Sequence, residues 1–206
     1  MRRLTPESYR LGLQELAARE PVFARILQQY GSPPLWDRPE GFPTLIHIIL
    51  EQQVSLASAA AAFRKLQEQV VPLTPQGFLE LDDASLKAIG FSRQKTTYGR
   101  CLAAAVLDKK LDLDALNTME PADVQHVLTS VKGIGVWTAD IYLLMVLLYA
   151  DVWPRGDLAL AKAVQRGLNL TEFPDTSRLE EMSDAWRPWR AIAARLFWFD
   201  YLDGKE

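Results

Sequence analysis

The sequence contains a single cysteine, Cys101, which lies inside an apolar run with helical spacing. One cysteine cannot form a disulfide within the chain, which suits a reducing compartment such as the cytosol. It also excludes an iron–sulfur cluster held by four cysteines. We therefore expect a cytoplasmic protein without such a cluster.

The chain also lacks an excess of positive charge. Its 23 lysine and arginine residues face 26 aspartate and glutamate residues, so the formal net charge is −3. This balance argues mildly against a nucleic-acid partner but does not exclude one, because a local basic face is sufficient. Residues 84–110 provide a candidate face, which fits an ordinary solvated helix surface equally well. Its basic side chains are Lys87, Arg93, Lys95, Arg100, Lys109 and Lys110.

Long apolar runs and a targeting signal are missing too. The longest apolar run, residues 141–150, is too short to span a bilayer. Residues 1–10 lack the apolar core of a signal peptide. We expect no association with a membrane.

Segments of alternating β-branched residues, which would predict strands, are absent as well. Apolar residues recur at helical spacing throughout, so the expected fold class is all-α. Several predicted helices follow a side chain suited to an N-cap, as at Thr5, Ser55 and Ser92. With 206 residues and 49% apolar content, the chain can form one domain or two small ones. The loop at 32–42, rich in proline and glycine, is the first plausible boundary.

The most informative stretch is residues 129–162. Within it, residues 132–135, with the sequence KGIG, form a turn between two helical patterns at 122–131 and 137–149. The second pattern is almost wholly apolar, which predicts a central core helix that runs to Tyr149.

Two glycines of this turn, Gly133 and Gly135, let the backbone bend tightly and expose its N–H groups. Since the second helix begins directly after them, these donors lie at a helix N-terminus. Such a terminus binds anions, and phosphate is the natural ligand. By itself, the Gly-x-Gly pattern also fits a plain helix–helix turn.

The residues around the turn make the pattern more specific. Residues 131–140, VKGIGVWTAD, resemble the helix-hairpin-helix of the DNA glycosylase superfamily, and among its branches the 3-methyladenine DNA glycosylase II (AlkA-type) enzymes. Three further blocks, 50–63, 90–98 and 186–198, match that family in the same order. Together the matches span about residues 33–200.

The resemblance implies two helical lobes with a cleft between them that holds the base. Residues 41–149 would form a helical barrel lobe that carries the helix-hairpin-helix at about 120–149. Residues 1–40 and 150–206 would form a second lobe with the catalytic aspartate. The chain is too short for the additional N-terminal α/β domain of AlkA, which we expect to be lacking.

The family's catalytic aspartate corresponds to Asp157. Cleavage of an N-glycosidic bond builds oxocarbenium charge at the sugar, as in glycoside hydrolysis. A fixed carboxylate in a water-poor cleft stabilises that charge and can orient or deprotonate a water. A cationic alkylated base leaves without a proton, so His47 and His126 are not required. From local sequence alone, Asp157 fits a helix N-cap.

The resemblance also implies a base pocket lined by Trp137 and Trp198, with Ile141 where AlkA has a tyrosine. Electron-rich rings would stack on a cationic methylated purine. Either tryptophan alone also fits core packing. Bifunctional relatives have a lysine at the position of Trp137, and an indole cannot be the nucleophile. We therefore expect a monofunctional enzyme without AP lyase activity.

Two loops carry the DNA contacts that the resemblance implies. Gln53 matches the side chain that enters the minor groove and fills the gap left by the flipped nucleotide. AlkA has a leucine there, and a glutamine also fits an ordinary surface position. The hairpin would hold a phosphate through N–H groups near its two glycines. Further DNA-binding candidates are Lys132, Arg93 and Lys95.

A monovalent cation, Na⁺ or K⁺, is implied at the hairpin as well. By motif position its ligands would be the main-chain carbonyls of Thr129, Val131 and Ile134. An ion between these carbonyls and a phosphate would offset the low net basicity of the chain. No cofactor is expected to be required for catalysis.

The function predicted is that of a monofunctional DNA glycosylase in base excision repair. It would flip out alkylated bases such as 3-methyladenine and 7-methylguanine and hydrolyse the N-glycosidic bond. We expect double-stranded DNA with alkylated bases as the partner, and a monomer. The alternatives are a glycosylase of the same superfamily for oxidised or mismatched bases, a non-catalytic helix-hairpin-helix DNA-binding protein, and a helical protein-interaction domain.

Overall fold

The structure, a computed structural model, describes residues 2–203, and its elements are helices joined by loops. Within this range the only β pairing is a single bridge between Arg3 and Tyr149. The all-α prediction is therefore confirmed. None of the helices within residues 2–203 is long and apolar enough to cross a membrane.

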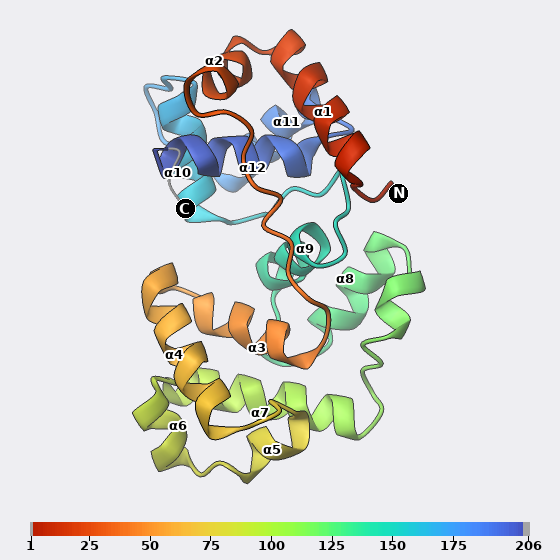
Figure 1. Ribbon diagram of the computed structural model, residues 1–206, viewed down its shortest axis with the longest axis vertical. Helices are drawn as coiled ribbons and strands as arrows, with labels where there is room; N and C mark the ends of the chain where they lie inside the picture. The colour runs from red at the N-terminus through yellow and green to blue at the C-terminus, as the bar shows by residue number, and fades with distance from the viewer. Residues whose placement is uncertain (1, 204–206) are drawn as a thin grey trace. The chain divides into compact units, whose positions relative to one another are not determined.

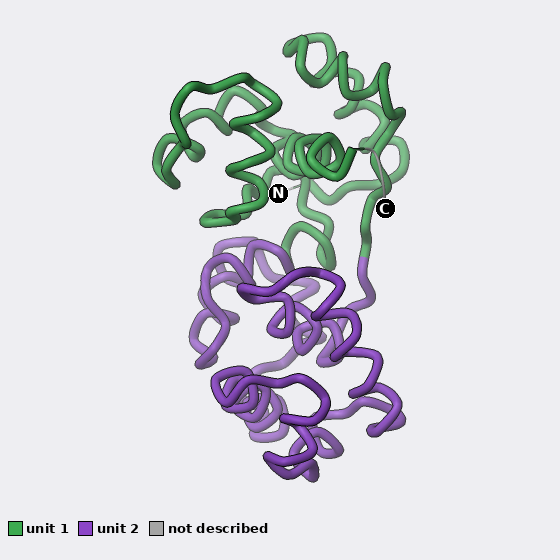
Figure 2. The backbone as a smooth tube through the Cα atoms, turned by 90° about the vertical axis from the view of Figure 1, so that its left-hand side faces the viewer, with its two compact units in different colours: residues 1–37, 143–206 green, residues 38–142 purple. Residues whose placement is uncertain are grey.

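The chain folds into two compact units, drawn in different colours in Figure 2. Unit 1 comprises Met1–Asp37 and Leu143–Glu206, and unit 2 comprises Arg38–Tyr142. The first and the last helices of the described residues thus belong to one unit. The boundaries lie at 37/38 and 142/143, whereas the sequence suggested 40/41 and 149/150.

Most helices belong to one unit each (Figure 1). Those of unit 1 are α1 (Pro6–Arg19), α2 (Pro21–Tyr30), α10 (Leu158–Gly167), α11 (Thr176–Ser183), the short 3-10 helix η2 (Asp184–Trp186) and α12 (Arg190–Tyr201). Those of unit 2 are α3 (Phe42–Glu51), α4 (Leu56–Gln69), α5 (Pro75–Glu80), α6 (Asp83–Ile89), α7 (Arg93–Leu107), the 3-10 helix η1 (Ala115–Thr118) and α8 (Pro121–Thr129). Helix α9 (Val136–Met145) begins in unit 2 and ends in unit 1.

Helix starts follow the local signals of the sequence. Thr5 caps α1 in a capping box with Ser8, while Ser55 and Ser92 cap α4 and α7. In each case the side-chain oxygen accepts an N–H that has no partner inside the helix. These starts are therefore fixed by residues within one turn.

Two helix ends differ from the sequence prediction. The central helix was expected to reach Tyr149, but α9 ends at Met145, because Leu148 adopts a φ of 56° and its carbonyl accepts the N–H of Leu4 at 2.7 Å. The apolar spacing of the block 186–198 also predicts a helix from Trp186, but α12 starts at Arg190. Pro188 accounts for this break, since proline has no N–H and disfavours helical backbone in the residue before it.

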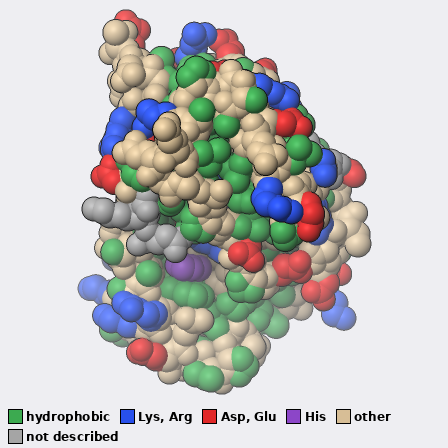
Figure 3. Space-filling model, turned by 45° about the horizontal axis from the view of Figure 1, so that its top comes forward, with side chains coloured by type: hydrophobic (Ala, Val, Ile, Leu, Met, Phe, Trp, Pro, Cys, Tyr) green, Lys and Arg blue, Asp and Glu red, His purple; other side chains and the backbone are tan. Residues whose placement is uncertain are grey.

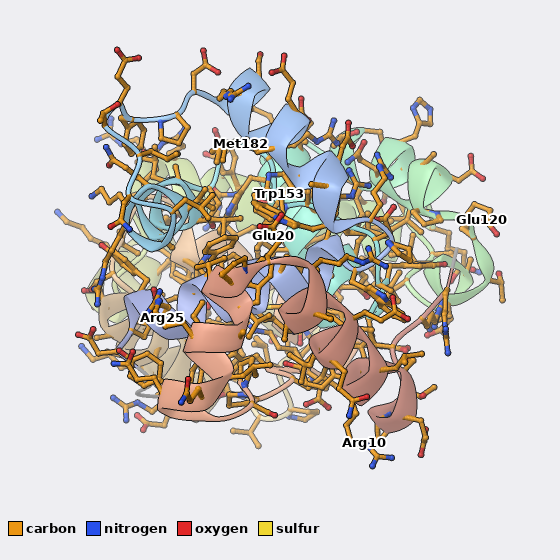
Figure 4. All side chains as sticks on the ribbon, turned by 90° about the horizontal axis from the view of Figure 1, so that it is seen from above. Arg10, Glu20, Arg25, Glu120, Trp153 and Met182 are labelled. Carbon is orange, nitrogen blue, oxygen red and sulfur yellow. The ribbon has the colours of Figure 1, made fainter. Side chains whose placement is uncertain are left out.

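Helix α12 lies at the centre of unit 1, with contacts to α1, α2 and α10 (Figure 1). Its Phe197 packs against Phe23 and Trp186, with ring centroids 5.0 and 5.1 Å apart. Arg25 of α2, labelled in Figure 4, forms a bidentate pair with Asp200 of α12 at 3.1 and 3.0 Å. Burial of these aromatic rings contributes to the hydrophobic stabilisation of this unit.

Arg195 is a second fixed point of unit 1. Its side chain is fully buried, yet it donates to the carbonyls of Leu35 at 2.7 Å, Ala191 at 3.0 Å and Leu144 at 2.8 Å. Burial lowers the pKa of Arg195 to about 10, so the guanidinium still carries its charge at neutral pH. One side chain thereby joins α12, the end of α9 and the loop before unit 2.

Unit 2 is built on α3, which packs against α4 and α7. Five of its apolar side chains are completely or almost completely buried: Leu45, Ile46, Ile48, Ile49 and Leu50. The C-terminus of α3 therefore cannot shift without disturbing the core. It leads directly into the loop that carries Gln53.

Candidate functional site

The hairpin between α8 and α9 has the tight backbone that its sequence predicts. The N–H of Val131 donates to Leu128 at 3.1 Å, and the N–H of Ile134 donates to Val131 at 3.0 Å. Gly133 has a φ of +100°, and a Cβ at this position would lie 2.2 Å from Cγ of Tyr98. Only glycine fits there, on both counts.

Gly135 differs from Gly133, because a Cβ at Gly135 would meet nothing within 4 Å. Gly135 and Val136 are exposed, and α9 starts at Val136. The first turn of a helix presents N–H groups without intrahelical acceptors. The N-terminus of α9 thus opens onto free space, which is the geometry that a bound phosphate requires.

Two further segments of unit 2 meet this hairpin. Gln52, the C-cap residue of α3, donates from Nε2 to the carbonyl of Gly133 at 3.0 Å and to Oγ1 of Thr138 at 3.0 Å. From α7, the ring of Tyr98 lies against Gly133. The hairpin is therefore held by α3 and α7 rather than by its own turn alone.

The three basic candidates near the hairpin have different surroundings. Lys132 and Arg93 are exposed. Lys95 instead donates from Nζ to the carbonyl of Leu50 at 2.6 Å, and burial lowers its pKa. The side chain of Lys95 thus has a partner at the C-terminus of α3, which the sequence pattern did not indicate. Basic and acidic side chains both appear on the face drawn in Figure 3, as the net charge of −3 would suggest.

Gln53 lies in the loop between α3 and α4 with a φ of 57°, in the left-handed region. This conformation is uncommon for a residue with a side chain. The side chain is exposed, as is that of Val54, which follows it. The loop therefore presents Gln53 outwards from a backbone fixed on both sides, by Gln52 and by the Ser55 cap.

Asp157 is the N-cap residue of α10, in unit 1. Its Oδ1 accepts the N–H of Leu160 at 2.7 Å and lies 3.5 Å from Nε1 of Trp198. The cap fixes the orientation of the carboxylate, and the indole N–H is near enough for a weak hydrogen bond. Asp157 is thus the helix N-cap that the local sequence suggested, and this role holds its carboxylate in one position.

A depression of about 240 Å³ in unit 1 borders Asp157. Its wall comes from the start of α10 and from the segment that leads into α11. The lining residues include Gly156, Leu158, Phe173 and Asp175. The carboxylate is therefore accessible from solvent and not sealed in the core.

The residues predicted to line the base pocket belong to different units. Trp198 is largely buried on α12 beside Asp157, in unit 1. Trp137 is half-buried and Ile141 is buried, and both belong to unit 2. These two lie one turn apart on α9 and so share a face of that helix. Their part in the base pocket stays a prediction.

The sequence pattern missed the bonds that brace the hairpin. Besides Gln52 and Thr138, these include Gln125 of α8, whose Nε2 donates to Oδ1 of the buried Asp140 on α9 at 2.6 Å. A buried carboxylate needs such a donor. The sequence does show an aspartate inside an apolar helix. Such an aspartate needs a hydrogen-bond donor, but the sequence does not indicate which residue provides it.

The three carbonyls proposed for a cation, those of Thr129, Val131 and Ile134, all belong to the end of α8 and the turn that follows it. Val131 accepts the N–H of Ile134, but a carbonyl has a second lone pair. No group of three or more His, Cys, Asp or Glu side chains in the described part of the chain is placed to hold a metal ion.

Several known proteins are similar to this chain in sequence and in fold. A family model described as HhH-GPD superfamily base excision DNA repair protein matches residues 46–190. The alkylbase DNA glycosidase-like protein mag2 of Schizosaccharomyces pombe is 25% identical over 197 residues, which cover 92% of each chain. DNA-3-methyladenine glycosylase 1 of the same species is 25% identical over 167 residues, 79% of this chain and 73% of that protein.

Among solved structures, the S. pombe 3-methyladenine DNA glycosylase Mag1 in complex with abasic DNA has a TM-score of 0.86. The match covers 91% of this chain and 95% of that chain, at 23% identity. At this identity the likeness concerns the fold.

Proposed function

Because the chain belongs to the HhH-GPD superfamily of base excision DNA repair proteins, we propose that it removes alkylated bases from double-stranded DNA by hydrolysing the N-glycosidic bond. The resemblance seen in the residues of the hairpin is confirmed by that family match. The observation that carries the proposal is Asp157, whose carboxylate is accessible and held in place by the α10 cap. The names of the relatives support alkylated bases as substrates.

The mechanism follows from charge development at the sugar. As the bond to the base breaks, the sugar gains oxocarbenium character, and a fixed carboxylate stabilises it without having to reorganise. Asp157 can also orient a water for attack on the same carbon. A cationic base such as 3-methyladenine or 7-methylguanine leaves without being protonated, so one carboxylate is sufficient.

We propose a monofunctional enzyme of the 3-methyladenine DNA glycosylase II type, which acts as a monomer. Strand cleavage by this superfamily uses an amine nucleophile, and the corresponding position here is Trp137. An indole cannot form a Schiff base. The product is therefore an intact strand with an abasic site.

DNA is held by the hairpin of unit 2 in this proposal. The exposed start of α9 binds a phosphate through its N–H groups, with Lys132 and Arg93 as nearby cations. The carbonyls of Thr129, Val131 and Ile134 are hard oxygen donors suited to Na⁺ or K⁺. A cation there would add positive charge beside the phosphate.

A decisive experiment replaces Asp157 by asparagine. Asparagine caps helices about as well as aspartate, so Asp157→Asn should keep the fold and DNA binding. It removes the negative charge and should abolish base release. The matched control is Asp82→Asn, because Asp82 caps α6 in the same way, accepting the N–H of Ser85 at 2.7 Å, and does not line the depression beside Asp157. The measurement is release of methylated bases from alkylated duplex DNA.

A non-catalytic DNA-binding protein is the second candidate, and the cap itself favours it, since capping alone would explain why an aspartate stands at 157. That candidate predicts no base release from any alkylated or oxidised substrate. Release by wild type, with none by Asp157→Asn and a normal rate for Asp82→Asn, would exclude it. A normal rate for Asp157→Asn would instead remove the catalytic role of this carboxylate.

A further inference from the structure

The side chain of Gln52 makes a connection that the proposed chemistry does not use. Its Nε2 lies 3.0 Å from the carbonyl of Gly133 and 3.0 Å from Oγ1 of Thr138, residues that are 81 and 86 positions further along the chain. A carbonyl can only accept, so the nitrogen of the amide must face the hairpin. Both amide hydrogens are thereby directed to the hairpin, one on each side of the α9 start.

The position of Gln52 in its own loop gives this connection a consequence. Gln52 ends α3, and the next residue is Gln53, with its left-handed backbone and exposed side chain. Because the side chain of Gln52 is bonded to the hairpin, the direction of the backbone at residue 53 is fixed as well. The exposed side chain of Gln53 and the N-terminus of α9 are therefore held in a fixed position relative to one another.

Other contacts anchor the end of α3 without Gln52. Glu51 forms a bidentate pair with Arg38 at 2.8 and 2.9 Å, and the carbonyl of Leu50 accepts from Lys95. The apolar side of α3 is buried as well. Loss of the Gln52 amide should thus leave the helix in place and free only the loop that follows.

We propose that Gln52 is a positioning residue that couples two DNA contacts, phosphate binding at the α9 N-terminus and insertion of Gln53 into the duplex. This inference rests on the proposed binding of DNA by this unit. A phosphate held by the hairpin then sets where Gln53 meets the base stack. Without the amide, either contact can form but the two are no longer aligned.

The test is a double-mutant cycle on duplex binding. Gln52→Met keeps the length of the side chain and removes its donor, and Gln53→Ala removes the proposed wedge. Binding is measured to a duplex with a tetrahydrofuran abasic analogue and to the same duplex undamaged. Each single variant should lower the preference for the abasic duplex about tenfold, and the double variant should lose little more than either one, as expected for residues that act together.

The second readout is specific to positioning. With 2-aminopurine opposite the abasic analogue, Gln52→Met should reduce the fluorescence change that reports unstacking, while its affinity for single-stranded DNA changes less than about twofold, because no gap needs filling there. Thr138→Val, which removes one of the two acceptors, should act in the same direction. Gln76→Met is the matched control, since it removes an amide hydrogen bond to Glu80 within α5, outside both the hairpin and the Gln53 loop.

The outcomes separate this inference from the proposed function. Base release by the wild-type protein tests the glycosylase, whereas the binding cycle needs no chemistry. Additive losses in the cycle, equal losses on duplex and single strand, or the same loss of abasic preference in Gln76→Met would overturn the positioning role. Should Gln52→Met fail to fold, the cycle is run with Thr138→Val, and the same results decide.

Discussion

Replacement of Arg195 by methionine gives the most direct test of what holds unit 1 together. The guanidinium is fully buried and donates to carbonyls on three separate segments, at Leu35, Leu144 and Ala191. Methionine fills much of the same volume but donates nothing. The variant therefore isolates the three hydrogen bonds from the packing.

The cost can be worked out from these contacts. Leu35 and Leu144 lie outside α12 and lose this buried donor, at about 1–3 kcal/mol each, while Ala191 is a helical carbonyl and counts for less. The sum of about 2–6 kcal/mol is reduced because methionine carries no charge that must be desolvated. We expect a net loss of about 2–4 kcal/mol in the free energy of unfolding, a value typical of a broken buried network.

Urea unfolding followed by tryptophan fluorescence measures this loss. All tryptophans except Trp137 belong to unit 1, so the signal reports chiefly on that unit. The matched control is Arg178→Met, whose pair with Glu181 is exposed and should be worth well under about 1 kcal/mol. A loss below about 1 kcal/mol for Arg195→Met, or one no larger than that of Arg178→Met, would refute the reasoning.

Three further predictions concern the site and the pH dependence of stability. Trp198→Ala should cost about 1–3 kcal/mol of transition-state stabilisation for a cationic base, by loss of stacking and cation–π attraction, and less for a neutral one. Single-turnover excision rates for a cationic and a neutral lesion measure this difference, and an equal fractional loss on both would assign Trp198 to packing. Incubation with alkylated DNA and borohydride should yield no covalent adduct, because Trp137 offers no amine; an adduct on a denaturing gel would contradict monofunctional action. Burial lowers the pKa of His47 below 6.5, so the unfolded chain takes up a proton more readily, and the free energy of unfolding should fall as the pH drops through about 6.5 towards the folded-state pKa. His47→Gln should remove that part of the dependence, as urea unfolding across this pH window would measure, and an unchanged profile would show that another group causes it.

Local features of the site were readable from the sequence. The positive φ of Gly133 follows from a tight turn before an apolar helix, whereas the ring of Tyr98 that lies against it comes from α7. The caps at Ser55, Ser92 and Asp157 depend on an N–H three residues later, so the chain specifies them within one helical turn. Such features can be recognised from the sequence alone, because donor and acceptor are close along the chain.

Features that depend on distant partners were not readable. The apolar pattern up to Tyr149 indicated a helix, but pairing of Leu4 with Leu148 ends α9 at Met145, since that segment gains hydrogen bonds outside the helix. The bond from Nζ of Lys95 to a carbonyl of α3 was likewise not indicated by the sequence, while the predicted contact of Lys95 with DNA stays a prediction. In both cases packing decides which of two satisfactory local arrangements is used.

The sequence by itself determined the all-α fold, the hairpin and the aspartate at the head of α10, because each depends on neighbours along the chain. Only the tertiary structure decided that Gln52, not obviously different from Gln53, turns inwards to Gly133 and Thr138. Two adjacent amides have the same local propensities. Their roles diverge because the partly buried carbonyl of Gly133, 81 residues away, accepts a hydrogen bond from Gln52, whereas the side chain of Gln53 is exposed.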